Sequence, residues 1–313
     1  MRDAPREPAD APLSHQTTLA RSSRWLHGGR LDGGGGAALR LHPAGPGRGV
    51  RFVRGDLAGE PLVHPRAQHL RAQHRWSALE EAGVWVHHTE HLLGALGGLG
   101  VDNALIELRS AWVPLLPSGS CAELCAALRE SGVVPLPAPR VPLLLTRPLV
   151  LEEELPPPPG VDGPAARCSV LALPDERLSL TCTFHVPALP GLRVGVGEHH
   201  QGERDFAATL GAARSFDLRD GLGRGAAAAQ GLLVMDERTT QAEVDEIARH
   251  KALDLLGDLM VLGQAPRARF VALRSGHRLH ARLVRTLAAG GYLVPAGEAR
   301  GSEAGQAPVS ARR

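Results

Sequence analysis

The chain has 313 residues, of which 43% are apolar and 22% are charged, a balance typical of a folded soluble protein and not of a disordered one. Its net charge is +2 and its aromatic content is 3%, which excludes the strongly basic or aromatic-rich surface expected of a nucleic-acid-binding protein. No apolar run approaches the roughly 20 residues that span a membrane.

Both ends of the chain are polar and rich in small residues, proline and arginine. We predict disordered tails at residues 1–16 and 298–313. The first segment, MRDAPREPADAP, also lacks the apolar stretch of a secretory signal. We therefore expect a cytoplasmic protein without an integral membrane segment.

The first half of the chain, residues 17–133, is predicted to form one α+β domain. Apolar runs and their periodicity predict strands at 37–41, 50–53, 83–87 and 104–108, and helices after His91 and at 122–130. The next stretch, VVPLPAPR, carries prolines at alternate positions. Such a stretch cannot be helical and favours an extended linker, so we place the domain boundary at residues 134–140.

The second half, residues 141–297, is predicted to form a second α+β domain of similar make-up. Extended segments are expected at 141–151, 167–173, 179–184, 231–235 and 268–273, and the clearest helices at 241–262 and 278–289.

A buried polar stripe is predicted on the first of these helices, in the sequence ARHKALDLLGDLM at residues 248–260. Helical spacing places His250, Asp254 and Asp258 one above another, with Lys251, the only lysine of the chain, beside them. The remaining surface is apolar, so the helix should be buried. Buried ionisable groups cost several kcal/mol unless they are paired or bind a metal, and a histidine and an aspartate one turn apart suit zinc.

A second candidate site is the sequence VHHTEH at residues 86–91. If it were helical throughout, His87 and His91 would match the H-x-x-E-H pattern of inverted zinc peptidases. A strand before it and a helix after it instead place a turn at His88-Thr89, with Glu90 and His91 in the first helical turn. We therefore expect one ligand, His91, and one base, Glu90. His87 and His88 either support the site from behind or lie on the surface of the turn, and we favour the surface.

A further strand, turn and helix at residues 269–279 leaves His277 at the turn, where packing does not explain it. Three protein ligands leave the fourth position of zinc open for water. Glu90 can take a proton from that water, and a free histidine can protonate a leaving amine. Together these groups indicate a metal-dependent hydrolase.

Seven segments in chain order also match a known pattern: WLHG at 25–28, LRLHPAGPGRGVRFVRGDL at 39–57, TEHLLGALGGLGVDN at 89–103, VPLLPSGS at 113–120, ARSFDL at 213–218, RHKALDLLGDL at 249–259 and SGH at 275–277. In order and spacing they resemble the zinc-dependent UDP-3-O-acyl-N-acetylglucosamine deacetylase family, which performs the committed step of lipid A synthesis. The resemblance runs from about residue 18 to 293.

The resemblance implies a zinc site in which His91, His250 and Asp254 are the ligands and Glu90 is the general base. The implied fold has two similar α+β domains, each a two-layer sandwich, with helices packed between the sheets and the active site at the domain interface. The implied substrate is a small UDP-linked acylated sugar. The acyl chain would permit peripheral membrane contact, and we expect a monomer.

The resemblance assigns the other candidate residues too. His277 would be the general acid or stabilise the oxyanion, with Asp258 orienting it, and Lys251 would bring positive charge to the substrate. Ser215 stands where the family has an oxyanion-binding threonine, and Phe216 beside it would bind substrate.

The chain departs from the family pattern in several places. The family usually has small or β-branched residues where this chain has His87, His88 and Thr89, and Ser118 replaces the aspartate of a DGSA-like loop. An alanine-rich insert at residues 221–237 stands where the family forms its acyl passage. Two alternatives therefore stay open: a divergent, catalytically weak paralogue with a binding or regulatory role, and an inverzincin-like metallopeptidase.

Overall fold

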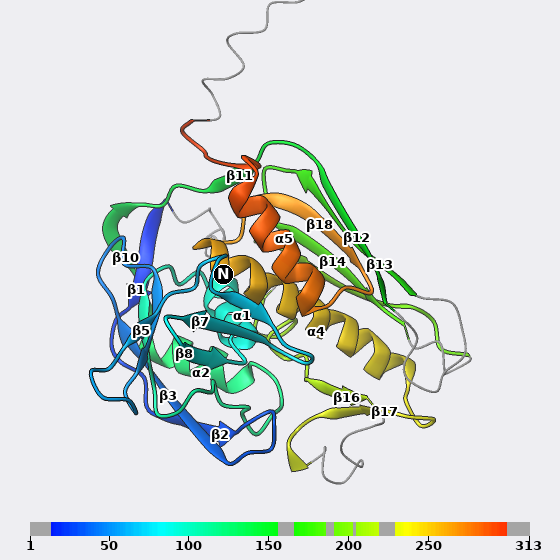
Figure 1. The fold of residues 1–313 in the computed structure, drawn as a ribbon, viewed down its shortest axis with the longest axis horizontal. Coiled ribbons are helices and arrows are strands. Elements are labelled where there is room, and N and C mark those ends of the chain that lie inside the picture. The colour runs from blue at the N-terminus through cyan, green and yellow to red at the C-terminus, as the bar shows by residue number, and fades with distance from the viewer. Residues whose placement is uncertain (1–13, 156–165, 186–190, 203–204, 219–228, 299–313) are drawn as a thin grey trace, which may run out of the picture.

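The computed structural model of the chain describes residues 14–155, 166–185, 191–202, 205–218 and 229–298 (Figure 1). Most of both predicted tails and residues 219–228, which include part of the alanine-rich insert, lie outside these ranges. Among the described helices, none combines the length and the apolar character needed to cross a membrane.

A five-stranded sheet organises the first half of the chain. Its strands are β2 (Leu26–Gly29), β3 (Gly36–Pro43), β4 (Val50–Arg54), β5 (Leu62–Val63) and β9 (Ala104–Leu108). Their spatial order is β2-β3-β9-β4-β5, and only the β4–β9 pair is parallel. Alternate side chains, such as Leu39, Leu41 and Ile106, point to one face and are fully buried there.

A second five-stranded sheet repeats this topology in the second half. Its strands are β12 (Leu149–Leu155), β13 (Ala166–Pro174), β14 (Ser179–Phe184), β15 (Gly195–His200) and β18 (Ala268–Leu273). Their order is β12-β13-β18-β14-β15, with β14 and β18 parallel and the other neighbours antiparallel. In both sheets the last strand in sequence lies in the centre, so the prediction of two similar α+β units is confirmed.

Among the described residues, four helices lie between the two sheets. They are α1 (Glu90–Gly98), α2 (Ala122–Ser131), α4 (Gln241–Leu259), which a 3-10 turn at Met260–Leu262 extends, and α5 (His277–Ala289). One helix precedes each central strand, α1 before β9 and α4 before β18, and one follows it. Figure 1 shows α1, α4 and α5 between the first-half strands and β12, β13, β14 and β18. A single large apolar core joins residues of both sheets, including Ile106 and Phe270.

Local sequence explains where α4 begins and why it packs so closely on α1. Thr240 and Glu243 form a reciprocal capping box at its N-terminus. Farther along, Gly257 lies against the start of α1, where an added Cβ would come 1.9 Å from the carbonyl oxygen of Glu90. Only glycine permits this approach, which brings the polar stripe of α4 next to His91.

The remaining strands form small sheets: β1 (His15–Leu19) with β10 (Val133–Pro139), β6 (Leu70–Ala72) with β7 (Ser77–Glu81) and β8 (Val84–His87), β11 (Leu143–Leu145) with β19 (Leu293–Pro295), and β16 (Phe216–Leu218) with β17 (Leu233–Met235). The proline-rich stretch predicted as a linker is extended, but it is strand β10, antiparallel to β1. Its prolines are tolerated because an edge strand needs few of its amide hydrogens. The exact domain limits stay predictions.

One further difference concerns the extended segment predicted at 141–151. It is two strands, because Leu143–Leu145 pairs with β19 while Leu149–Leu155 pairs with β13. Between them, the amide of Thr146 donates to the carbonyl of Tyr292 and Pro148 has no amide hydrogen to donate. The chain therefore changes partners at this point.

Candidate active site

Two strand-to-helix turns present the histidines predicted near the helix starts. β8 ends at His87 and α1 begins at Glu90, while β18 ends at Leu273 and α5 begins at His277. Each turn contains a non-glycine residue in the left-handed region, His88 with φ 61° and Arg274 with φ 55°. Such conformations are uncommon outside glycine and concentrate at functional sites.

Three buried side chains meet where α1 crosses α4. His91 Nε2 lies 3.2 Å from His250 Nε2 and 3.6 Å from Asp254 Oδ1, and the last two atoms are 3.4 Å apart. A tetrahedral metal ion with bonds of about 2.0–2.2 Å separates its ligands by roughly 3.3–3.6 Å. The spacing and the chemistry of these donors therefore fit a metal ion. The structure brings together the three residues predicted as ligands, and their role as ligands stays a prediction.

Hydrogen bonding orients the ring of His250 toward this cluster. Its Nδ1 lies 3.2 Å from the carbonyl oxygen of Ala213. A carbonyl can only accept, so Nδ1 carries the proton and Nε2 keeps its lone pair for the cluster. Burial lowers the pKa of His250 to about 4, so the ring is neutral at physiological pH. Burial would raise the pKa of Asp254, but its charged and hydrogen-bonding neighbours, among them the ammonium of Lys251, hold it well below the usual range, so Asp254 stays ionised.

Glu90 lies beside the cluster and is almost fully buried. Its Oε2 accepts a hydrogen bond from the amide of Ser77 (3.0 Å), and its Oε1 lies 3.8 Å from His277 Nε2. Burial raises the pKa of Glu90 to about 7, with His277 and His91 acting in the opposite direction. A carboxylate with a pKa near neutrality suits general base catalysis.

Asp258 holds His277 in place. It contacts Nδ1 of the ring, while Glu90 lies near Nε2. His277 Nδ1 donates to Asp258 Oδ2 over 3.1 Å. Burial alone would lower the pKa of His277, but the carboxylates of Asp258, Asp254 and Glu90 raise it to about 9. The side chain is therefore an imidazolium at neutral pH, with its Nε2–H directed toward Glu90 and Asp254.

Sequence reasoning missed two partners of Asp258. His280 is fully buried, and its Nδ1 donates to Asp258 Oδ2 over 2.9 Å. Ser77 donates its hydroxyl to Asp258 Oδ1. His280 had a local signal, because it follows His277 by three residues on one helix face. Ser77 had none, since it comes from β7.

Lys251, Ser215 and Phe216 lie on the second-half side of the cluster. Lys251 Nζ donates to Asp254 Oδ2 over 3.1 Å and lies 5.3 Å from the ring centre of Phe216. The hydroxyl of Ser215 is buried without a hydrogen-bond partner among the described residues. Native proteins rarely leave such a group unpaired, and an ordered water or a bound molecule is its natural partner.

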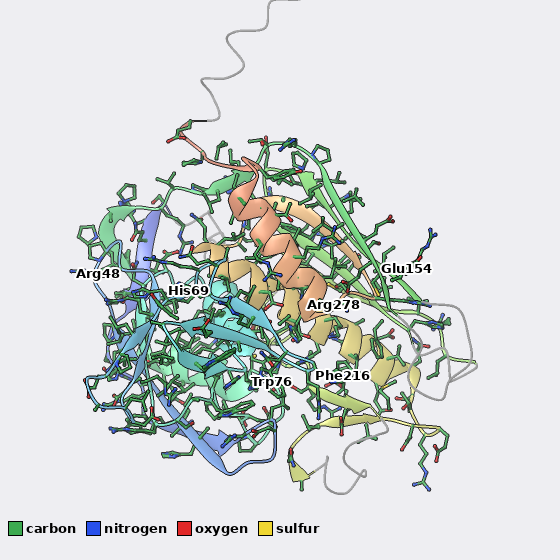
Figure 2. All side chains as sticks on the ribbon, viewed as in Figure 1. Arg48, His69, Trp76, Glu154, Phe216 and Arg278 are labelled. Carbon is green, nitrogen blue, oxygen red and sulfur yellow. The ribbon has the colours of Figure 1, made fainter. Side chains whose placement is uncertain are left out.

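On the side of the ligand cluster formed by the first half of the chain, His87 belongs to a cluster of aromatic side chains. Its ring stacks between those of Trp85 and Trp112, at centroid distances of 5.4 and 4.6 Å, and Nδ1 accepts from Trp76 Nε1. Arg75, which precedes Trp76, and Asp217, which follows Phe216, form an ion pair of 3.0 Å, and Trp76 and Phe216 are labelled in Figure 2. Because His87 ends a strand while His91 is helical, the two do not share the helix face that the H-x-x-E-H interpretation requires.

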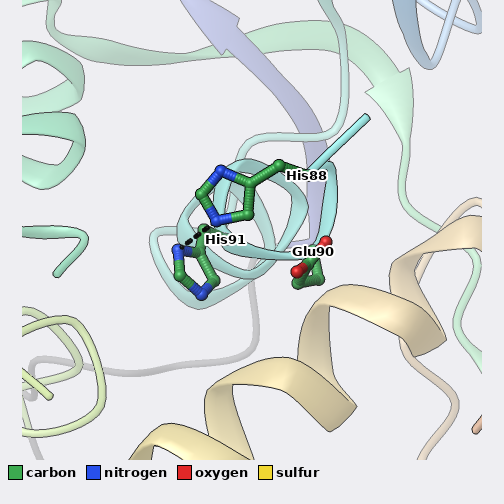
Figure 3. A group of neighbouring side chains, drawn as sticks. All are labelled: His88, Glu90 and His91. Atoms are coloured by element: carbon green, nitrogen blue, oxygen red, sulfur yellow. Dashed lines mark hydrogen bonds between the residues drawn. The ribbon is translucent and has the colours of Figure 1, made fainter. Parts of the chain in front are cut away.

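The prediction that His88 lies on the surface of the turn is wrong. Only 1% of His88 is exposed, and Nε2 lies 3.0 Å from His91 Nδ1 (Figure 3). Residues 111–113 lie beside the turn. Two backbone hydrogen bonds join them to His87, and the carbonyl oxygen of Val113 lies 3.3 Å from His88 Nδ1.

Comparison with known proteins identifies the family. The model of the LpxC family, described as UDP-3-O-acyl N-acetylglycosamine deacetylase, matches residues 16–289. The chain belongs to the LpxC family. The resemblance drawn from the sequence is thereby confirmed.

Relatives with the name UDP-3-O-acyl-N-acetylglucosamine deacetylase support this LpxC assignment. The protein of Thermosynechococcus vestitus is 31% identical, over 90% of this chain and 96% of its own length. Those of Myxococcus xanthus and Solibacter usitatus are 32% and 33% identical, over 87% of this chain and 85% and 90% of their own lengths. The relatives are named for deacetylation, so the prediction of a hydrolytic enzyme is confirmed.

Proposed function

We propose that this LpxC-family protein is a zinc-dependent deacetylase that releases acetate from the nitrogen of a UDP-linked, 3-O-acylated N-acetylglucosamine, within lipid A synthesis. One observation carries the proposal: the His91, His250 and Asp254 cluster lies directly beside a pair formed by Glu90 and His277. Ligand atoms of Glu90, Asp254 and His277 all lie within 4.8 Å of one another. Cytoplasmic location and a monomeric state remain part of the prediction.

His91, His250 and Asp254 would hold the zinc ion. When bound there, zinc polarises the acetyl carbonyl and acidifies a water molecule. Two imidazole nitrogens and one carboxylate are a common catalytic zinc donor set, and three protein ligands leave a position open. The fixed proton on His250 Nδ1 supports this assignment, because it leaves Nε2 free to coordinate.

Glu90 would accept the proton of the attacking water. The amide of Ser77 holds Oε2 in place, which leaves Oε1 on the side of His277. His277 would then donate its Nε2 proton to the nitrogen of the departing sugar amine. Asp258 holds the proton on Nδ1, so the proton that can be transferred is the one on Nε2.

Ser215 and Lys251 would act on the charge that develops on the acetyl oxygen. The hydroxyl of Ser215 is buried and has no hydrogen-bond partner among the described residues, so it could donate to an oxyanion without first breaking a hydrogen bond within that part of the chain. The ammonium of Lys251 is fixed by Asp254 and adds positive charge on the same side.

We expect a bell-shaped dependence of kcat/KM on pH. Activity should rise as Glu90, with a pKa of about 7, loses its proton and becomes a base. It should fall as His277, with a pKa of about 9, loses its proton and ceases to be an acid. Steady-state rates between pH 5.5 and 10 measure both limbs. In His277→Ala the residual activity should lose the alkaline limb, and an unchanged limb would contradict the assignment.

The test of the proposal is acetate release from UDP-3-O-acyl-N-acetylglucosamine by the zinc-loaded protein, followed with a coupled enzyme assay. Robust turnover that disappears on zinc removal is expected. Absence of turnover in a fully zinc-loaded protein would favour the weak paralogue instead. Ser118, one of the departures behind the paralogue hypothesis, bonds to Glu123 and Ser120 in the loop before α2.

A further inference from the structure

The turn between β8 and α1 contains a histidine, His88, whose backbone conformation is more typical of glycine. His88 has a φ of 61°, a value that glycine adopts without strain and that is uncommon for other residues. The residue is also buried. A strained position of this kind persists when the surrounding contacts hold it, and here those contacts are made by the ring.

The ring of His88 joins two fixed groups. Its Nδ1 lies 3.3 Å from the carbonyl oxygen of Val113. Val113 is itself fixed, because its amide donates to the carbonyl of His87, whose own amide donates to Ala111. The carbonyl of Val113 can only accept, so the proton of the neutral His88 ring is on Nδ1 and Nε2 carries a lone pair.

That lone pair determines the tautomer of His91. His88 Nε2 lies 3.0 Å from His91 Nδ1 (Figure 3), so His91 must donate from Nδ1. The lone pair of His91 is then on Nε2, the atom that lies 3.2 Å from His250 Nε2 and 3.6 Å from Asp254 Oδ1. The hydrogen bonds therefore run in one direction, from His91 to His88 to the main chain.

We propose that His88 is a positioning residue for the metal centre, which holds the imidazole of His91 as the Nδ1-protonated tautomer with Nε2 aimed at the other two ligands. The inference rests on the proposed function, because it takes His91 as a metal ligand. It gives a role to one of the positions at which this chain departs from the pattern of its family.

Zinc affinity of the full-length protein, measured by competition with a chromophoric chelator, tests the role. His88→Phe retains a planar ring but lacks an acceptor, and removal of such a supporting hydrogen bond weakens metal binding about 10–100-fold. His88→Gln places an amide oxygen near the position of Nε2, so it should recover most of the affinity. The cobalt-loaded protein should show an altered ligand-field spectrum in the Phe variant and a near-native one in the Gln variant. His87→Phe, one residue away in the aromatic cluster, is the matched control and should bind zinc as the wild type does.

The outcomes separate the two proposals. If His91→Ala keeps stoichiometric zinc, the proposed function fails. If His91→Ala loses zinc while His88→Phe binds it as tightly as the wild type, the role of His88 is overturned.

A measurement on the zinc-loaded wild type does not depend on the folding of any variant. Nitrogen-15 NMR of the histidine rings should find His88 protonated on Nδ1 and coupled through its Nε2 to His91 Nδ1. A proton on His88 Nε2 would overturn the inference.

Discussion

Asp254→Ala is expected to reduce bound zinc from about one ion per chain to nearly none and to abolish acetate release. The substitution removes one of only three protein donors that a catalytic zinc site uses. It also leaves Lys251, whose ammonium donates to Asp254 over 3.1 Å, without its partner in a largely buried position. Elemental analysis of the purified protein after dialysis against zinc-free buffer measures the loss, and thermal unfolding shows whether the variant is folded.

His87→Ala is the control for this experiment. His87 belongs to the VHHTEH sequence but contacts tryptophan rings and not the ligand cluster, so its variant should retain most of the zinc. The reverse pattern, with zinc kept in Asp254→Ala and lost in His87→Ala, would refute the assignment of the site.

Glu90→Gln should lower kcat by about 10²–10⁴-fold while zinc content stays at the wild-type level, which is the range general base catalysis contributes. Glutamine has nearly the same shape and can still accept from the amide of Ser77 through its oxygen, but it cannot take a proton at neutral pH. Acetate release by zinc-loaded protein at saturating substrate measures the effect.

A matched carboxylate serves as the control for Glu90. Glu80 lies on β7 and pairs with Arg71 outside the cluster, so Glu80→Gln should leave kcat unchanged. A wild-type rate in Glu90→Gln would mean that another group takes the proton. The loss of the acidic limb from the pH profile in any residual activity would support the assignment independently.

The sequence predicted those parts of the site that depend on local periodicity. The polar stripe of α4 is one such part, because helical spacing alone places His250, Asp254 and Asp258 on one line. The turn before α1 is another, since a strand followed by a helix leaves few positions for Glu90 and His91. In both cases the structure places these residues where the local pattern puts them.

Errors and omissions occurred where distant segments meet. His88 was expected at the surface, but residues 111–113 lie beside its turn, and their contact with the turn has no local signature. The hydrogen bond from Ser77 on β7 to Asp258 on α4 likewise joins segments far apart in the sequence. The sequence predicts an extended stretch at residues 134–140 but not its pairing, because the partner strand, β1, lies at the other end of the first half. Propensity and pattern report on neighbours in sequence, and these contacts are between segments far apart.

The single apolar core that joins the two sheets has a consequence for cooperativity. Its members include Leu39 and Ile106 from the first sheet and Leu180 and Phe270 from the second. Because the sheets cannot separate without exposing this shared surface, the two halves are expected to unfold in one transition. His91 belongs to one half, and His250 and Asp254 belong to the other. The alignment of the donors is thus as stable as the whole molecule, and a bound ion would in turn raise the melting temperature of both halves together.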